Sequence, residues 1–217
     1  MDRDVFLARV GRAAMTGRLP APPDVSASLP ELEPADLVAL FRDSLQKVDG
    51  VVHGPVSGHG APVVVSGIAS GHGCSTFMAW DDLPAPGVAA ELTADGLQRV
   101  DHDIEESSRL EHQLGYVPLS LGVTGALTGL ADSGSLVLSH GPGRPRMASL
   151  VPEVHVALLR VSDLDRTLSI WAHNHPAAAA ETANLVMVTG PSRTGDIEQQ
   201  LNLGVHGPRH LHVVLVS

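Results

Sequence analysis

Residues Gly122–Leu159 read GVTGALTGLADSGSLVLSHGPGRPRMASLVPEVHVALL, and two apolar runs within them decide the fold class. Ser135–Ser139 and Val154–Leu159 are continuous apolar runs without strict alternation, which is typical of central strands covered on both faces. Between Gly122 and the first run we expect a short strand and a glycine-rich turn with a small helix. Strand and helix signals alternate through the rest of the chain, so the sequence predicts an α/β protein with a mostly parallel sheet.

Four apolar runs provide the strands that we assign to this sheet. Helical segments separate the runs along the chain, as the crossovers between parallel strands require. We therefore expect one mainly parallel sheet that contains all four: Leu136–Leu138, Val154–Leu158, Leu185–Val188 and Val213–Val216.

The chain divides into an N-terminal arm and one α/β domain. Asp2–Met15 mixes apolar and charged residues in a manner that favours a short amphipathic helix, and a proline-rich segment follows at Leu19–Pro30. We assign residues 1–33 to this helix and arm, and residues 34–217 to the α/β domain. A chain of 217 residues fits such a division.

Local signals conflict in one segment, and a helix is expected in a later one. The β-branched run Pro62–Ile68 favours a strand by propensity. We predict a helix between residues 54 and 73 instead, because the strands on either side need a crossover if they are parallel neighbours. Farther along, Ser162–Asp163 is expected to cap a helix that carries Leu164, Leu168 and Trp171.

Composition argues against several classes of protein. The net charge of −10 and the pI near 5.5 argue against nucleic-acid binding, which needs a basic patch. The chain has no apolar run long enough to span a membrane and no apolar signal segment near its N-terminus, so we expect a cytoplasmic protein. Cys74 is the only cysteine, which excludes an internal disulfide and a cluster held by cysteines of this chain alone.

The loop after the first apolar run has the features of an anion-binding site. Gly141 and Gly143 allow backbone amides to approach a ligand, and Arg144 and Arg146 offer planar guanidinium groups to a carboxylate or phosphate. The alternative is an ordinary turn with two solvated arginines. We favour the anion site because a tight loop between two buried strands has no structural need for both arginines.

A second glycine-rich segment, Gly190–Gly207, is expected to form a strand, a turn and a helix that Ser192 or Thr194 caps. The amides after Gly190 would then bind an anion at the helix N-terminus, beside Arg193. The segment matches neither the P-loop nor the dinucleotide fingerprint. It could equally be an ordinary capped helix with acidic residues in its first turn.

Three side chains are candidates for acid–base chemistry: Asp132, Glu198 and His206. The histidine pairs His173/His175 and His210/His212 have spacings that metal sites use, but no third ligand is indicated near either pair. We therefore predict no metal site.

Six motifs together resemble the LUD-domain family of lactate utilisation proteins. They are Gly-Val-Thr-Gly at Gly122, Ala-Asp-Ser-Gly-Ser-Leu-Val-Leu at Ala131, Gly-Pro-Gly-Arg-Pro-Arg at Gly141, Leu-Val-Pro-Glu-Val-His at Leu150, Gly-Pro-Ser-Arg-Thr-Gly-Asp-Ile-Glu at Gly190 and Leu-Gly-Val-His-Gly-Pro at Leu203. The resemblance implies a three-layer sandwich of the NagB/RpiA/CoA-transferase type with a Rossmann-like sheet. It also implies a part in the oxidation of L-lactate to pyruvate, together with iron–sulfur partner proteins that carry the electrons.

Two functional hypotheses follow. In the first, the chain is a component of a lactate-oxidising system that has no cluster of its own, and it binds a small 2-hydroxy or 2-oxo acid or organises its iron–sulfur partners. In the second, it is a stand-alone enzyme of sugar-phosphate isomerase or acyl-transfer type, with Glu198 or Asp132 as the base. The sequence leaves open whether the isolated chain is catalytic.

Overall fold

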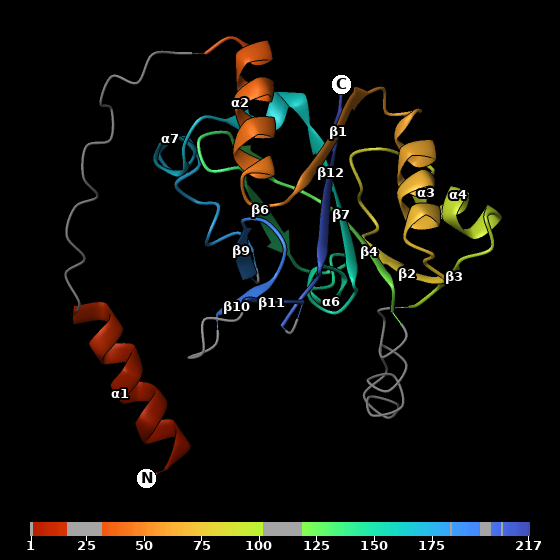
Figure 1. Cartoon of the computed structure of the whole chain (residues 1–217). Helices are drawn as coiled ribbons and strands as arrows, with labels where there is room; N and C mark the ends of the chain where they lie inside the picture. The colour runs from red at the N-terminus through yellow and green to blue at the C-terminus, as the bar shows by residue number, and fades with distance from the viewer. Residues whose placement is uncertain (1, 17–31, 102–118, 183, 196–200, 205) are drawn as a thin grey trace.

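The computed structural model describes residues 2–16, 32–101, 119–182, 184–195, 201–204 and 206–217. Its main element is a six-stranded sheet in the order β1-β12-β7-β4-β2-β3, in which every pair of neighbours is parallel (Figure 1). The strands are β1 (Val51–Val56), β2 (Thr76–Ala79), β3 (Gln98–Arg99), β4 (Leu121–Gly125), β7 (Val154–Arg160) and β12 (His210–Val216). This sheet confirms the predicted α/β class.

Both faces of the main sheet are covered, which explains the continuous apolar runs. In β12, Leu211, Val213 and Leu215 face the core beneath α2 (Pro34–Gln46), and Val214 and Val216 face α3 (Ala61–Gly71). Figure 1 shows α3 and α4 (Val88–Ala94) together on one side of the sheet and α2 on the other. With every side chain of β12 after His210 buried, a simple alternation of polar and apolar residues is lost.

Helix α3 confirms the helix expected between residues 54 and 73. Its β-branched residues would suit a strand, but the helix provides the crossover from β1 to β2. Ala61, Val65 and Ile68 bury one face against the sheet, whereas Val63 is 65% exposed. Burial of this face therefore outweighs the modest helix propensity of valine.

A second, four-stranded sheet corrects the single sheet expected from the sequence. Its order is β8-β5-β6-β9, with β6 antiparallel to both neighbours. The strands are β5 (Thr128–Leu130), β6 (Ser135–His140), β8 (Leu164–Asp165) and β9 (Asn184–Val188). Two of the four expected strands, β6 and β9, thus lie outside the parallel sheet, and β5 stands where a small helix was expected.

The short connection between β5 and β6 is the physical reason. Four residues, from Ala131 to Gly134, are enough for a hairpin but far too few for a parallel crossover. Gly134 has a φ of 66°, and a Cβ there would lie 2.4 Å from Leu45 N, so the turn depends on glycine. Strand β6 still reads as a central strand because Leu136 and Leu138 bury one face in the main core, while Val137 packs against Trp171 on the other.

One predicted helix is wrong, and another begins later than expected but does carry Leu168 and Trp171. The segment after Gly190 forms an antiparallel hairpin of β10 (Arg193–Gly195) and β11 (Leu201–Leu203), so no helix begins there. The segment after Ser162 forms a short 3-10 helix (Val161–Asp163) and β8. Helix α7 (Leu168–Asn174) begins only after Thr167, whose Oγ1 accepts a hydrogen bond from Ile170 N at 3.2 Å.

The structure describes two further α-helices. Helix α1 (Arg3–Thr16) confirms the N-terminal helix, with Val5, Phe6 and Val10 exposed, and α6 (Met147–Leu150) precedes β7. Within the described ranges, no helix has the length and apolar character needed to cross a membrane.

Replacing Gly122 by alanine should destabilise the fold strongly. A Cβ on this residue of β4 would lie 1.7 Å from Ala148 O and 2.6 Å from Pro152 Cγ, so the backbone of α6 would have to move. We expect a loss on the order of 3 kcal/mol in the free energy of unfolding, measured in urea by circular dichroism. Gly67→Ala is the matched control, because Gly67 is exposed in α3 and a Cβ added there would meet no atom within 4 Å beyond the adjacent helix backbone. This change should raise the free energy of unfolding by about 0.5–1 kcal/mol. Equal effects of the two changes would contradict the close packing of α6 on β4.

Candidate functional site

The order of the strands creates a topological switch point between β2 and β4. From β2 the chain reaches β3 at the edge of the sheet, and it later returns to β4 on the other side of β2. Ligands of open parallel sheets bind beyond the carboxyl ends of the strands at such points. Trp80–Pro84 follows β2 and Ala126–Leu127 follows β4, and a cavity of about 140 Å³ lies between these segments.

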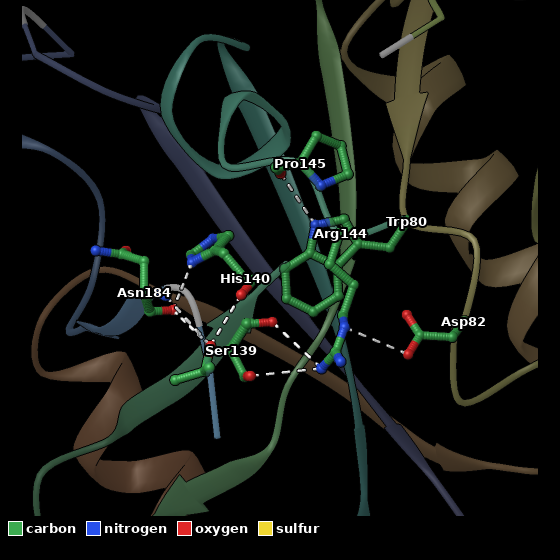
Figure 2. A network of polar contacts seen from close by, with 8 residues as sticks. Trp80, Asp82, Ser139, His140, Arg144, Pro145 and Asn184 are labelled. Atoms are coloured by element: carbon green, nitrogen blue, oxygen red, sulfur yellow. Dashed lines mark hydrogen bonds and ion pairs between the residues drawn. The ribbon is translucent and has the colours of Figure 1, made fainter. Parts of the chain in front are cut away.

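The loop Gly141–Arg146 carries the end of β6 to this switch point. Asp81 N donates a hydrogen bond to Gly143 O at 2.9 Å. Trp80 Nε1 donates to Pro145 O at 3.1 Å, as Figure 2 shows. Gly143 has a φ of 69°, and a Cβ there would approach Asp81 Oδ2 to 2.9 Å, so glycine lets the loop approach Asp81 closely. The loop is thus fixed against the carboxyl end of β2.

The side chain of Arg144 points into the switch point, with its donors poorly satisfied. Its Nη1 lies 3.4 Å from both the carbonyl oxygen and Oγ of Ser139, and its Nε lies 3.5 Å from Asp82 Oδ2 (Figure 2). These contacts are longer than the roughly 2.7–2.9 Å of charge-assisted hydrogen bonds. Nε is buried, and no described residue offers it an acceptor in hydrogen-bonding geometry. A guanidinium group in this state can bind a carboxylate or phosphate with two parallel hydrogen bonds.

Arg144 lines two cavities, which we together call the groove. The smaller cavity is the one at the switch point, and the larger, of about 410 Å³, extends toward α7 and includes His175 and Glu181. Leu127, Ser139 and Arg144 line both cavities. The smaller cavity suits a ligand well below drug size, since drug-sized ligands occupy roughly 300–1,000 Å³.

Sequence reasoning found Arg144 but missed four of its neighbours in the smaller cavity: Trp80, Asp82, Ser139 and Arg160. Asp82 and Arg160 had a signal, because each is a charged residue at or shortly after the end of an apolar parallel strand. Trp80 and Ser139 had none, because both are buried and read as core residues.

A separate cavity contains three of the other predicted site residues. Gly190, Ser192 and His206 line a space of about 270 Å³ between β9 and the strands β7 and β12. Leu211 and Pro208 line it as well, so its walls are mostly apolar. The structure therefore does not bring these three residues into the cavities that Arg144 lines.

Polar side chains form the boundary between the two regions. His140 Nδ1 lies 3.3 Å from Asn184 O, and its Nε2 lies 3.3 Å from Ser149 Oγ (Figure 2 shows the first contact). His155 lines the 270 Å³ cavity, and its Nε2 lies 2.9 Å from Thr124 Oγ1. Burial lowers the pKa of His140, and it lowers the pKa of His155 to about 3. Both imidazoles are neutral at pH 7 and can each donate one hydrogen bond and accept another.

The other predicted residues lie elsewhere. Asp132 pairs with Arg166, with Nε and Oδ1 3.5 Å apart, at the start of β6, whereas Arg144 follows the end of that strand. Arg193 forms an ion pair with Asp49, and Arg146 is exposed and lines neither cavity of the groove. Gly141 closes the tight turn by a bridge to Arg144. Of Thr194 only the backbone, within β10, is described, and Glu198 lies outside the described residues.

The LUD domain matches residues 38–216, which is most of the chain. This chain is a LUD-domain protein. Similar proteins include lactate utilization protein C of Geobacillus sp., 29% identical over 160 residues (69% of this chain), and lactate utilization protein C of Deinococcus radiodurans, 33% identical over 96 residues (44% of this chain). This LUD-domain chain spans 66% and 45%, respectively, of the length of these two relatives.

A solved structure supports the fold of this LUD-domain protein. A DUF162 family protein from Deinococcus radiodurans has a TM-score of 0.64 and 21% sequence identity, and the match covers 86% of this chain and all of that chain. At this level of identity the likeness establishes the fold alone, and the function must be argued from the site.

The buried His155 should make stability fall as the pH is lowered. Its folded pKa of about 3 lies below the ordinary value of 6.5, so the unfolded chain binds the proton more readily and protonation favours unfolding below about pH 6.5. Between about pH 7 and pH 5 this one group should remove about 2 kcal/mol from the free energy of unfolding.

Urea titrations at both pH values measure this effect. His155→Gln should lose about 2 kcal/mol of the pH-dependent decline, whereas His59→Gln, at an exposed position, should retain the full decline. An unchanged decline in His155→Gln would show that His155 is not buried as a neutral group.

Proposed function

We propose that this protein is a component of a lactate utilisation system and that it binds a small 2-hydroxy or 2-oxo carboxylate at Arg144. The names of two relatives, lactate utilization protein C, support the system. The observation that supports this binding site is the position of Arg144. Its guanidinium group enters the switch point with a buried Nε that has no hydrogen-bond acceptor among the described residues.

The groove has the chemistry that a small hydroxy acid needs. A carboxylate at Arg144 would gain charge-assisted hydrogen bonds worth about 1.5–3 kcal/mol each. Ser139 Oγ lies 3.4 Å from Arg144 Nη1 and can donate to a ligand hydroxyl or carbonyl oxygen. Arg160 lines the same cavity but is paired with Asp163, with Nη1 and Oδ2 3.6 Å apart, so Arg144 is the group expected to hold the carboxylate. Trp80 provides an apolar wall.

Oxidation of a 2-hydroxy acid to a 2-oxo acid releases two electrons and two protons, so the substrate needs an acceptor. With Cys74 as its only cysteine, this chain cannot supply the four thiolates of a cysteine-ligated cluster. We propose that iron–sulfur partner proteins carry the electrons and that this chain binds and orients the acid. The geometry gives less support to a stand-alone isomerase, because Asp132 pairs with Arg166 at the opposite end of β6 from Arg144.

Removing Arg144 should weaken ligand binding while the fold stays intact. In calorimetric titrations with L-lactate and with pyruvate, Arg144→Ala should raise the Kd at least tenfold, because one charge-assisted hydrogen bond of 1.4 kcal/mol is worth a decade. Arg146→Ala is the matched control, since Arg146 lies on the same loop but is exposed, and its Kd should stay within about twofold of wild type.

Arg144→Lys separates charge from geometry in the same titration. Lysine keeps the positive charge but lacks the planar fork, so this variant should bind more weakly than wild type. Equal loss in Arg144→Ala and Arg146→Ala would contradict the site, and no binding of either acid by wild type would contradict the proposed ligand.

The dependence on partners has its own test. Purified protein with a simple electron acceptor should leave L-lactate unoxidised, and native protein from cells grown on lactate should co-purify with proteins that show the absorbance of iron–sulfur clusters. Turnover of L-lactate by the isolated chain would refute this part of the proposal and leave the Arg144 binding test unaffected.

A further inference from the structure

Four histidines gather at the opposite end of the main sheet from Arg144. His210 and His212 lie in the first half of β12, His53 lies in β1 beside them, and His72 is the C-terminal cap residue of α3. The sequence had indicated no third ligand near His210 and His212. His53 comes beside His212 because β1 pairs in parallel with β12. His72 comes beside it because α3 runs antiparallel to the strands and ends there.

The ring nitrogens are close enough to interact directly. His72 Nε2 and His212 Nε2 lie 3.0 Å apart, and His212 Nδ1 lies 3.0 Å from His53 Nε2. The ring of His210 is close to that of His72, with centroids 4.5 Å apart. His212 is 9% exposed, whereas His72 and His210 are exposed at the surface and can change rotamer.

We propose that His72 and His212 bind one divalent transition-metal ion through their Nε2 atoms, with His210 as a further ligand. Two nitrogens 3.0 Å apart, each about 2.1 Å from a metal, would subtend an angle of about 90°. This is the cis angle of octahedral and square-planar sites, so the pair suits Ni²⁺ or Cu²⁺ better than tetrahedral Zn²⁺.

His53 has the position of a supporting residue. A metal on His212 Nε2 leaves the proton of that ring on Nδ1, which faces His53 Nε2 at 3.0 Å and can donate to it. Such a hydrogen bond fixes the tautomer and orientation of a ligating imidazole, and its loss typically costs 10- to 100-fold in metal affinity.

The charges around the cluster permit a cation. Both ring nitrogens of His212 face other imidazoles, so a metal on Nε2 would replace its contact with His72 Nε2. The carboxylate of Glu153, the residue before β7, favours positive charge at His72. The guanidinium group of Arg42 disfavours positive charge at His53. Among the described residues, no three potential ligands already surround one point, so the side chain of His210 must turn toward the metal to complete the set.

The chain contains its own control for this site. Ser-Gly-His-Gly occurs twice, at Ser57–Gly60 and at Ser70–Gly73, so His59 and His72 have the same neighbours in sequence. Both side chains are exposed, but of the two only His72 lies within 3.0 Å of another imidazole nitrogen among the described residues. His59→Ala and His72→Ala therefore differ in the cluster and in little else.

Calorimetric titration of tag-free, chelator-treated protein with NiCl₂ tests the proposal. Wild type should bind one Ni²⁺ per chain, and His59→Ala should bind with the same affinity. His72→Ala should bind at least tenfold more weakly, and His53→Phe, which keeps the ligands but removes the supporting nitrogen, about tenfold more weakly.

Thermal unfolding provides a second readout, because a ligand that binds only the folded state raises the Tm. Ni²⁺ should raise the Tm of wild type and of His59→Ala, and it should raise that of His72→Ala much less. Absence of Ni²⁺ and Cu²⁺ binding by wild type, or equal binding by His59→Ala and His72→Ala, would overturn the proposal. Neither measurement involves lactate or Arg144, so the result is independent of the proposed function.

Discussion

The hydrogen bond from Asp81 N to Gly143 O is the contact on which the candidate site depends. It joins a loop of the antiparallel sheet to the carboxyl end of β2 in the parallel sheet, and the bond from Trp80 Nε1 to Pro145 O reinforces it. Without this docking, Arg144 would lie on a surface loop with no cavity around it. The site is thus a property of the junction between two sheets, and neither sheet forms it alone.

The main sheet offers different chemistry at its two ends. At the carboxyl ends, the guanidinium group of Arg144 lies at the topological switch point, where ligands bind in open parallel sheets. At the amino ends, the imidazole nitrogens around His212 suit a metal ion. These two sites belong to opposite ends of parallel strands, so ligands at both could be present together without direct contact.

Prediction from sequence succeeded where a pattern reflected burial and failed where it depended on partners. Val154–Leu158 and Val213–Val216 form central parallel strands as expected, because both of their faces are covered by helices or by the second sheet. Leu136–Leu138 has the same apolar pattern, but it lies in an antiparallel strand whose two faces are covered by the main core and by Trp171. Burial on both faces looks alike in sequence whichever sheet provides it.

By itself, the sequence determined the α/β class, the helix α3 and the family motifs, and it made Arg144 a candidate for anion binding, because all of these follow from local pattern or residue chemistry. Only the tertiary structure decided which strands share a sheet, that Ser192 and His206 line a different cavity from Arg144, and that His53 and His72 join His212. The physical reason is that strand pairing and loop docking are long-range interactions. Their partners are chosen by the summed packing of the whole chain, which no single segment encodes.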